Sequence, residues 1–301
     1  MPNFNASTLS AILLIYGILF GVELLIFYPI FACFKWLMLR RIGMPRDERK
    51  LVFSNRERYF NLEYFVDRYG DRQLRVVDGL SRKLLHIVSG IWQLAILNVF
   101  IKDTEIALIA TLTYQIFVLG LSIISYHSNK IFGLAGLMYG ASSRIRDGIY
   151  GRKNLFAARC SFLNLIPLAY IDHVARTSIP DSSRLVLFSF FVFLPLTVGD
   201  ALGELIGTTW GKQKLYVWGI GQINRKSLLG TSAVFLGSLI PLLIVTYLNH
   251  LPLPWWILAL TISAATTLIE LAAPRGTDNF FIPVGNASLC LAFALRFLAS
   301  G

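Results

Sequence analysis

The apolar run "LVLFSFFVFLPLT" (residues 185–197) leads directly into "VGDALGELIGTTWGKQK" (residues 198–214). The first run, with the start of the second, is long enough to cross a bilayer as a helix, which takes about 20 residues. Asp200 and Glu204 follow one helical turn apart, just before the chain becomes basic and polar. Carboxylates at membrane depth are costly unless something binds them, so this stretch predicts a membrane helix with a polar function.

The composition of the whole chain agrees with a membrane protein. Of the 301 residues, 55% are hydrophobic and only 15% are charged, whereas about 25% are charged in soluble domains. A soluble globular protein is therefore excluded as an interpretation. We predict an all-α, polytopic integral membrane protein with about eight transmembrane helices.

Apolar runs bounded by charged or turn residues give the positions of these helices. The eight expected spans are residues 11–34, 84–101, 106–125, 154–172, 185–209, 228–248, 253–273 and 280–299.

The charges of the loops predict the orientation of the spans. Alternate loops, at residues 35–83, 126–153, 210–227 and 274–279, hold 23 of the 28 lysines and arginines. The positive-inside rule places these loops in the cytoplasm or its equivalent, and both termini on the other side. This bias accounts for most of the net charge of +11, so no nucleic-acid partner is expected. Within the first basic loop, "RERYFNLEYFVDRYGDR" (residues 56–72) interleaves aromatic and charged residues, which is typical of an amphipathic helix on anionic headgroups.

Two stripes run along the helix that holds Asp200 and Glu204. Thr208 continues the stripe of these two residues, and glycines at positions 199, 203, 207 and 211 form a bare stripe beside it. Such glycine columns usually allow two membrane helices to pack closely. They would also let a bulky anion approach the backbone. The sequence leaves both interpretations open.

Basic and hydroxyl residues gather on the same predicted side of the membrane. The turn after this helix carries Lys212, Arg225 and Lys226, and Ser227 stands at the start of the next span. Free N–H groups at a helix N-terminus, beside basic residues, are a natural site for an anion. The second span opens with Arg82 and Lys83, and His86 lies one turn further along.

Further carboxylates are expected at this side, namely Glu270 near the end of the seventh span and Asp278 before the eighth. Carboxylates with phosphate oxygens are the usual ligands of Mg²⁺ in nucleotide sites, and nearby cations stabilise a transferring phosphoryl group. Metal-assisted phosphoryl or nucleotidyl transfer at the membrane surface is the resulting hypothesis. The chain has no P-loop or protein-kinase signature.

Five ordered blocks of the chain resemble the CTP-dependent polyprenol kinases, which include dolichol, phytol and farnesol kinases and are more distantly similar to the CDP-diacylglycerol synthases. The blocks are "SRKLLHIVSG" (81–90), "SSRIRDGIYGRKNLF" (142–156), "GDALGELIGTTWGKQKL" (199–215), "NRKSLLGTSAVF" (224–235) and "RGTDNFFIPV" (275–284). Glu204 stands where the family usually has aspartate, and Thr208 and Thr209 replace a pair of arginines. The resemblance divides the chain into residues 1–79, a transmembrane helix with a basic amphipathic segment, and residues 80–301, the catalytic domain.

The resemblance implies a membrane-embedded kinase that transfers the γ-phosphate of CTP, or of another nucleoside triphosphate, to an isoprenoid alcohol. The block at residues 142–156 favours phytol or a similar short prenol as the lipid-soluble acceptor. The implied catalytic residues are Asp200, His86 and Lys83; the implied Mg²⁺ ligands are Asp200, Glu204, Asp278 and Glu270; and the implied nucleotide and phosphate contacts are Arg82, Lys212, Arg225, Lys226, Ser227, Gly207 and Gly211.

Two other functions stay open at this point. One is a cytidylyltransferase or diacylglycerol kinase acting on phospholipid precursors, and the other is a transporter or lipid-binding membrane protein without enzymatic activity. The expected location is the bacterial inner, thylakoid or endoplasmic reticulum membrane, with the active site on the cytoplasmic or equivalent face and with membrane lipids as neighbours. The sequence does not determine the oligomeric state, and a homodimer is one of the open alternatives.

Overall fold

The computed structural model describes residues 10, 13–14, 17–18, 21–54, 62–95, 141, 145, 187–217, 224–273 and 278–297. Helices make up nearly all of this part of the chain. The elements are η1 (Glu23–Phe27), α2 (Tyr28–Arg41), α3 (Arg46–Ser54), α4 (Leu62–Tyr69), α5 (Asp71–Ala95), α10 (Phe188–Leu194), η7 (Pro195–Gly199), α11 (Asp200–Thr209), β1 (Lys214–Val217), β2 (Asn224–Ser227), α12 (Leu228–Leu248), α13 (Leu253–Ala272) and α14 (Asp278–Phe297), where η1 and η7 are π-helical.

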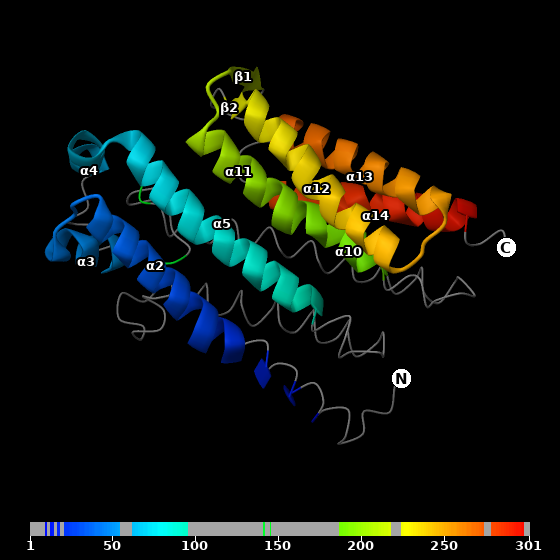
Figure 1. The fold of residues 1–301 in the computed structure, drawn as a ribbon, viewed down its shortest axis with the longest axis horizontal. Helices are drawn as coiled ribbons and strands as arrows, with labels where there is room; N and C mark the ends of the chain where they lie inside the picture. Colours follow the sequence, from blue (N-terminus) through cyan, green and yellow to red (C-terminus); the bar gives the residue numbers. More distant parts are fainter. Residues whose placement is uncertain are drawn as a thin grey trace.

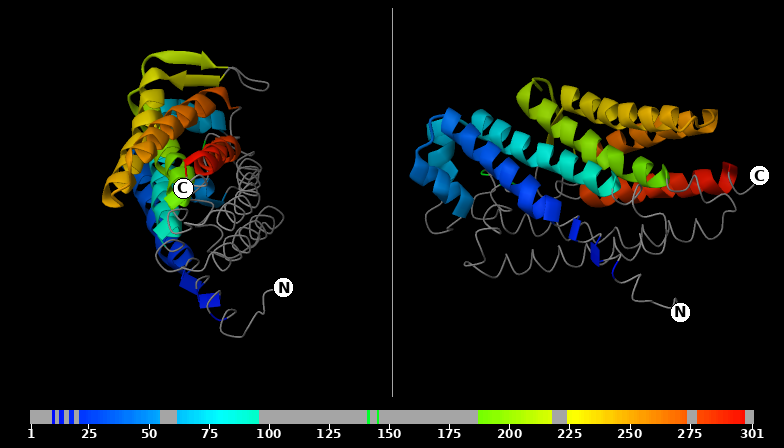
Figure 2. Two further views of the ribbon diagram at one scale, coloured as in Figure 1. Left: turned by 90° about the vertical axis from the view of Figure 1, so that its right-hand side faces the viewer. Right: turned by 60° about the horizontal axis from the view of Figure 1, so that its bottom comes forward.

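The long helices lie side by side as a bundle (Figure 1). α11 packs between α5 and α12, α2 packs on the other side of α5, and α13 lies between α12 and α14. The strands β1 and β2 project beyond the helices at one end of the bundle, as Figure 2 shows. This order places α5, which carries Arg82, Lys83 and His86, next to α11, which carries Asp200 and Glu204.

Four segments are long and apolar enough to cross a membrane, namely Phe188–Thr209, Leu228–Leu248, Leu253–Ala272 and Asp278–Phe297. They coincide within a few residues with the last four expected spans, so these four predictions are confirmed. The expected spans at 106–125 and 154–172 lie outside the described residues. The total of eight spans and the position of both termini stay predictions.

The first of these spans is one continuous helix with a π-helical turn in its middle. The backbone N–H of Asp200 donates to the carbonyl oxygen of Pro195, five residues back. Proline has no N–H to donate to the preceding turn and crowds the carbonyl four residues before it, so a change in the helical pattern near Pro195 has a local cause. π-helical turns are frequent at functional sites, and this one ends at the first of the two carboxylates.

Two buried clusters hold the bundle together. In the first, Trp255 of α13 is only 1% exposed and packs against Phe188, Phe191 and Phe293 of α10 and α14. Aromatic pairs in these geometries stabilise beyond their buried area, by about 0.5–1.5 kcal/mol each. This cluster fixes α10, and therefore α11, against the last two helices.

The second cluster joins α2, α4 and α5, and includes Leu39, Phe65 and Leu74. Phe65, from the segment that we expected on the membrane surface, is 1% exposed. The apolar side of α4 is thus covered by protein, and contact of this segment with headgroups stays a prediction. The division of the chain at residue 79 also stays a prediction; α5 runs through that position without a break.

The two strands are a departure from the all-α expectation. Residues 214–227 were expected as a turn, but β1 and β2 pair antiparallel, with Lys214 opposite Ser227 and Leu215 opposite Lys226. Each strand has only four residues, which is too short for a pattern of alternating burial to be recognised in the sequence. The hairpin returns the chain to α12 and carries Lys226 toward the other site residues.

Candidate active site

A network of ion pairs joins α5 to α11. The ammonium of Lys83 is hydrogen-bonded to the carboxylate of Asp200 and lies 3.2 Å from Oε2 of Glu204. Arg82, the preceding residue, pairs with the same oxygen of Glu204. The side chains of Lys83 and Asp200 are 7% and 6% exposed, whereas Arg82 and Glu204 are partly open to the surface. Two cations of one helix therefore face two carboxylates of the next.

The close approach of α5 to η7, the turn that leads into α11, depends on Gly90 of α5. A side chain at Gly90 would place its Cβ 2.9 Å from Cβ of Thr197, which is closer than real contacts allow. Gly79 is also buried, and a Cβ there would lie 3.8 Å from Leu205 and Thr208. Between these two glycines, α5 presents Lys83 and His86 directly to the carboxylate side of α11.

A second ion pair comes from elements that lie later in the chain. Lys226 of β2 pairs with Glu270 of α13, and both side chains are mostly buried. Asp278, the first residue of α14, interacts electrostatically with Asp200, Lys83 and Lys226. Glu270 interacts with Asp200 and Asp278. Asp200 thus lies within electrostatic range of each of the other three predicted carboxylates.

Arg82 and Thr231 each have a buried polar atom without a hydrogen-bond partner in the described part of the chain. These atoms are Nε of Arg82 and Oγ1 of Thr231, in the first turn of α12. A buried guanidinium N–H without an acceptor costs free energy that an incoming anionic oxygen would recover. Nε of Arg82 is therefore a hydrogen-bond donor available to an anion, and it lies beside the carboxylate of Glu204. A phosphate that binds together with a cation needs both kinds of group.

His86 lies on the face of α5 that carries Lys83. Its Nε2 is 3.4 Å from the carbonyl oxygen of Leu196, inside the π-helical turn η7. Its other interacting neighbours include Lys83 and Asp200. The imidazole is therefore next to the ion-pair network, and its predicted catalytic role stays untested.

Three predicted phosphate contacts lie where α11 packs on the N-terminus of α12, namely Ser227, Gly207 and Gly211. Ser227 is the N-cap of α12, and its hydroxyl oxygen accepts a hydrogen bond of 3.0 Å from the N–H of Gly230. Gly207 faces this cap, since a Cβ there would lie 2.8 Å from Oγ of Ser227. Gly211 also faces Ser227. The contacts show close packing of α11 on α12, and a role in phosphate binding stays a prediction.

Two predicted phosphate contacts lie at the edge of the site. Lys212 is exposed in the short connection between α11 and β1. Arg225 belongs to β2, opposite Tyr216. The roles of these two residues in phosphate binding stay predictions.

The arrangement of the carboxylates limits how a metal ion could be held. No group of three or more His, Cys, Asp or Glu residues within the described ranges could hold a metal ion, so the four predicted ligands do not form a single cage. Asp200 and Glu204, however, already share one cation, the ammonium of Lys83. Mg²⁺ is commonly held by one or two carboxylates together with substrate phosphates. The residues present fit that kind of site, and the magnesium itself stays a prediction.

Arg72 is a site neighbour that the sequence analysis did not single out. Its Nη2 donates a hydrogen bond of 2.8 Å to the carbonyl oxygen of Thr209, the last residue of α11. Basic residues near the end of a helix commonly satisfy its last carbonyl groups. No spacing in the sequence indicates this contact, because the two residues are 137 positions apart.

Comparisons with known proteins agree with the kinase resemblance over part of the chain. The chain is 30% identical over 112 residues to a phytol kinase of Synechocystis sp. (strain ATCC 27184 / PCC 6803 / Kazusa). The matched stretch covers 37% of this chain and 46% of the relative, which is less than half of that protein. No protein family model matches the chain, and no solved structure does. The more distant resemblance to the CDP-diacylglycerol synthases stays a prediction.

Proposed function

We propose that the protein is a membrane-embedded kinase that transfers the γ-phosphate of a nucleoside triphosphate to an isoprenoid alcohol. The observation that carries the proposal is the meeting of Arg82 and Lys83 of α5 with Asp200 and Glu204 of α11 at one end of a membrane bundle. The similarity to a phytol kinase supports the reaction class.

The charge pattern of the network suits a complex of a cation and a polyphosphate. Asp200 and Glu204 would hold a divalent ion in place of the lysine ammonium, and Lys83 together with Nε of Arg82 would bind the phosphates. Each buried charge keeps an opposite partner through this exchange, which avoids the large penalty of a lone buried charge. Mg²⁺ would supply neutralisation of the phosphate charge.

The reaction needs an acceptor hydroxyl beside the phosphates. The oxygen of the alcohol forms a bond to the γ-phosphorus while the bond from that phosphorus to the bridging oxygen breaks, and the nucleoside diphosphate leaves. In this proposal His86, which lies on the same face of α5 as Lys83, orients the hydroxyl or takes its proton. Since the transition state of phosphoryl transfer is loose, positioning and charge stabilisation contribute more than the base.

Two finer features of the proposal rest on the family resemblance. CTP is the proposed donor, and phytol or a similar short prenol is the proposed acceptor. No contact among the described residues distinguishes cytosine from adenine, so the donor has to be found by experiment.

The test uses the purified full chain with nucleotides labelled at the γ-phosphate. CTP, ATP and GTP are each combined with phytol, farnesol, a polyprenol and diacylglycerol, and labelled lipid is measured. We expect labelled prenyl phosphate, and a loss of at least about a hundredfold in the Asp200→Asn variant. Labelling of diacylglycerol alone would refute the prenol assignment. Release of pyrophosphate with phosphatidic acid would instead identify a cytidylyltransferase.

A further inference from the structure

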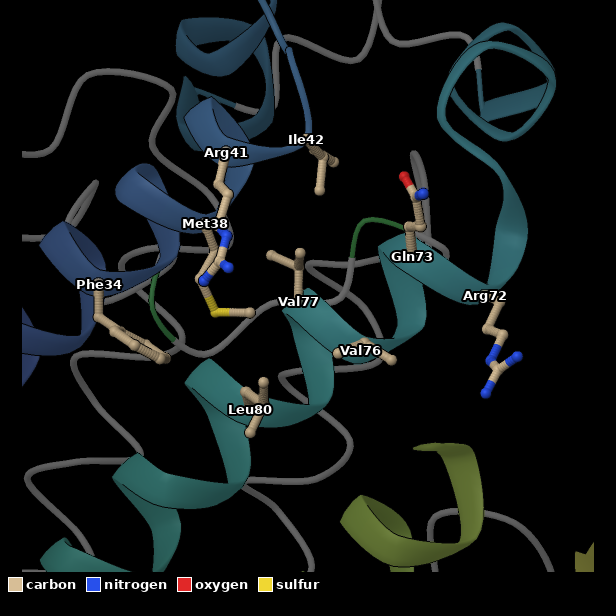
Figure 3. A pocket seen from close by; sticks show the side chains of 9 residues that line it. All are labelled: Phe34, Met38, Arg41, Ile42, Arg72, Gln73, Val76, Val77 and Leu80. Carbon is tan, nitrogen blue, oxygen red and sulfur yellow. The ribbon is translucent and has the colours of Figure 1, made fainter. Parts of the chain in front are cut away.

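An open groove lies between α2 and α5, apart from the ion-pair network. It has a volume of about 860 Å³. The lining residues are Phe34, Met38, Arg41, Ile42, Arg72, Gln73, Val76, Val77 and Leu80, which come from the end of α2 and the beginning of α5 (Figure 3).

The groove divides into a basic end and an apolar part. Arg41 is the last residue of α2, and Arg72 is in the first turn of α5. Both are exposed. Phe34 and Met38 lie one to two turns before Arg41, and Val76 and Leu80 lie one to two turns after Arg72. Figure 3 shows the side chains of the two arginines well apart, with that of Arg41 beside Met38 and that of Arg72 directed away from it. The guanidinium group of Arg41, with hydrocarbon side chains beside it, matches an anionic headgroup attached to an apolar chain.

The contact between Arg72 and Thr209 gives the depth of the basic end. Thr209 is the last residue of the candidate membrane span Phe188–Thr209, and its carbonyl oxygen accepts the hydrogen bond of Arg72. Arg72 is therefore level with the end of a membrane helix, where the phosphates of lipids lie. The apolar lining is on the bilayer side of this level.

The apolar surface continues from the groove along α5. Leu80, Leu84, Ile87 and Ile91 follow one face of the helix at spacings of three and four residues. Ile91 is 46% exposed. A hydrocarbon chain in the groove can thus extend along α5 into the bilayer.

We propose that this groove binds an anionic phospholipid, with its phosphate at the guanidinium group of Arg41 and one acyl chain along α5. The proposal does not depend on the kinase activity. The acceptor alcohol would need its hydroxyl near Lys83, which lies three helical turns further along α5 than Arg72. The basic end of the groove is therefore placed for a headgroup at the membrane surface.

The matched pair Arg41→Gln and Arg40→Gln tests the headgroup site. Both arginines are exposed in the last turn of α2. Both can therefore interact favourably with the dipole of the helix and extend their guanidinium groups to lipid headgroups. Only Arg41 lines the groove. The difference between the variants therefore isolates the groove from general attraction to an anionic surface.

The measurement is native mass spectrometry of the full chain in detergent, titrated with phosphatidylglycerol or phosphatidylcholine. We expect wild type to retain phosphatidylglycerol more tightly, and Arg41→Gln to weaken this retention roughly fivefold. Arg40→Gln should keep it, and glycerol phosphate without acyl chains should not compete. Equal retention of the two lipids, an equal effect of both variants, or full competition by glycerol phosphate would each overturn the proposal.

A groove-filling variant tests the apolar part separately. Val76→Trp places a large side chain on the groove floor without changing charge, and we expect it to reduce retention of phosphatidylglycerol while the melting temperature stays close to that of wild type. If this variant changes the oligomeric mass of the protein and leaves lipid retention intact, the groove is a contact with a second copy of the chain and the lipid proposal is wrong.

Discussion

The ammonium of Lys83 on α5 is hydrogen-bonded to the carboxylate of Asp200 on α11, and both side chains are less than a tenth exposed. The two residues are 117 positions apart in the chain. A buried ion pair of this kind is weak evidence for stability, because desolvation offsets most of the attraction. Its presence at a helix contact where an apolar pair would also fit is better explained by function.

The first prediction separates the stability of this pair from its function. Lys83→Met leaves Asp200 buried without its lysine and should destabilise the protein by about 3–5 kcal/mol. The double variant Lys83→Met, Asp200→Leu removes both charges and should recover most of the melting temperature. We expect both variants to lack kinase activity. An active double variant would show that the pair has only a structural role.

The second prediction concerns the pair between Lys35 of α2 and Asp78 of α5. Their charged atoms are 3.0 Å apart and the side chains are 0% and 5% exposed, while Asp78 also accepts a hydrogen bond from the backbone N–H of Ile145. Lys35→Met should therefore lower the free energy of unfolding by about 3–5 kcal/mol. Thermal unfolding in detergent measures this change.

The control for this variant is Lys50→Met. Lys50 pairs with Asp47 at 3.3 Å, but these side chains are 59% and 92% exposed. Loss of this exposed ion pair should change the free energy of unfolding by no more than about 0.5 kcal/mol. Similar melting temperatures for Lys35→Met and Lys50→Met would contradict the importance of burial at Lys35.

The positions of the membrane helices and of the charged site residues could be predicted from the sequence for clear physical reasons. Apolar runs report directly on the length of a span, which is why the last four spans agree with the structure. Glu270 and Asp278 could be assigned to one side because each stands at the end of its span, and Asp200 and Glu204 because they lie in the half of their span toward that side. Their proximity depends on helix packing, with α11 against α12 and α13 between α12 and α14.

The pairing of side chains could not be predicted in the same way. Which of Arg82 and Lys83 meets which carboxylate depends on the rotation of α5 against α11, and the close contact of Gly90 with Thr197 limits that approach. The π-helical turn before Asp200 and the hairpin of β1 and β2 are short features without a periodic signal. The sequence also left two roles open for the glycines of α11, and their contacts with α12 show packing.

The third prediction concerns alkaline pH and the helices before α5. Burial raises the pKa of Tyr69 to about 12, and its hydrogen bond of 2.6 Å to the carboxylate of Glu48 adds to this shift. The neutral phenol is thus favoured in the folded protein. Its stabilising effect is complete below pH about 10, the ordinary pKa of tyrosine, and is lost as the pH rises through about 12.

Tyr69→Phe tests this dependence. Without the ionising phenol, the melting temperature of the variant should fall less steeply than that of wild type between pH 10 and about 12. Parallel curves for the two proteins would show that Tyr69 does not ionise with a shifted pKa.

The last prediction decides between packing and phosphate binding at Gly207. A Cβ at this position would lie 2.8 Å from Oγ of Ser227 and 3.2 Å from the backbone Cα of Gly230. Since the second atom is backbone, Gly207→Ala should push α11 away from α12 and lower the melting temperature by the equivalent of about 1–3 kcal/mol. Gly79→Ala is the matched control, because its Cβ would meet only ordinary contacts at 3.8 Å and alanine favours the helix. If Gly207→Ala instead keeps the melting temperature and raises KM for the nucleotide alone, the bare backbone at this position serves phosphate binding.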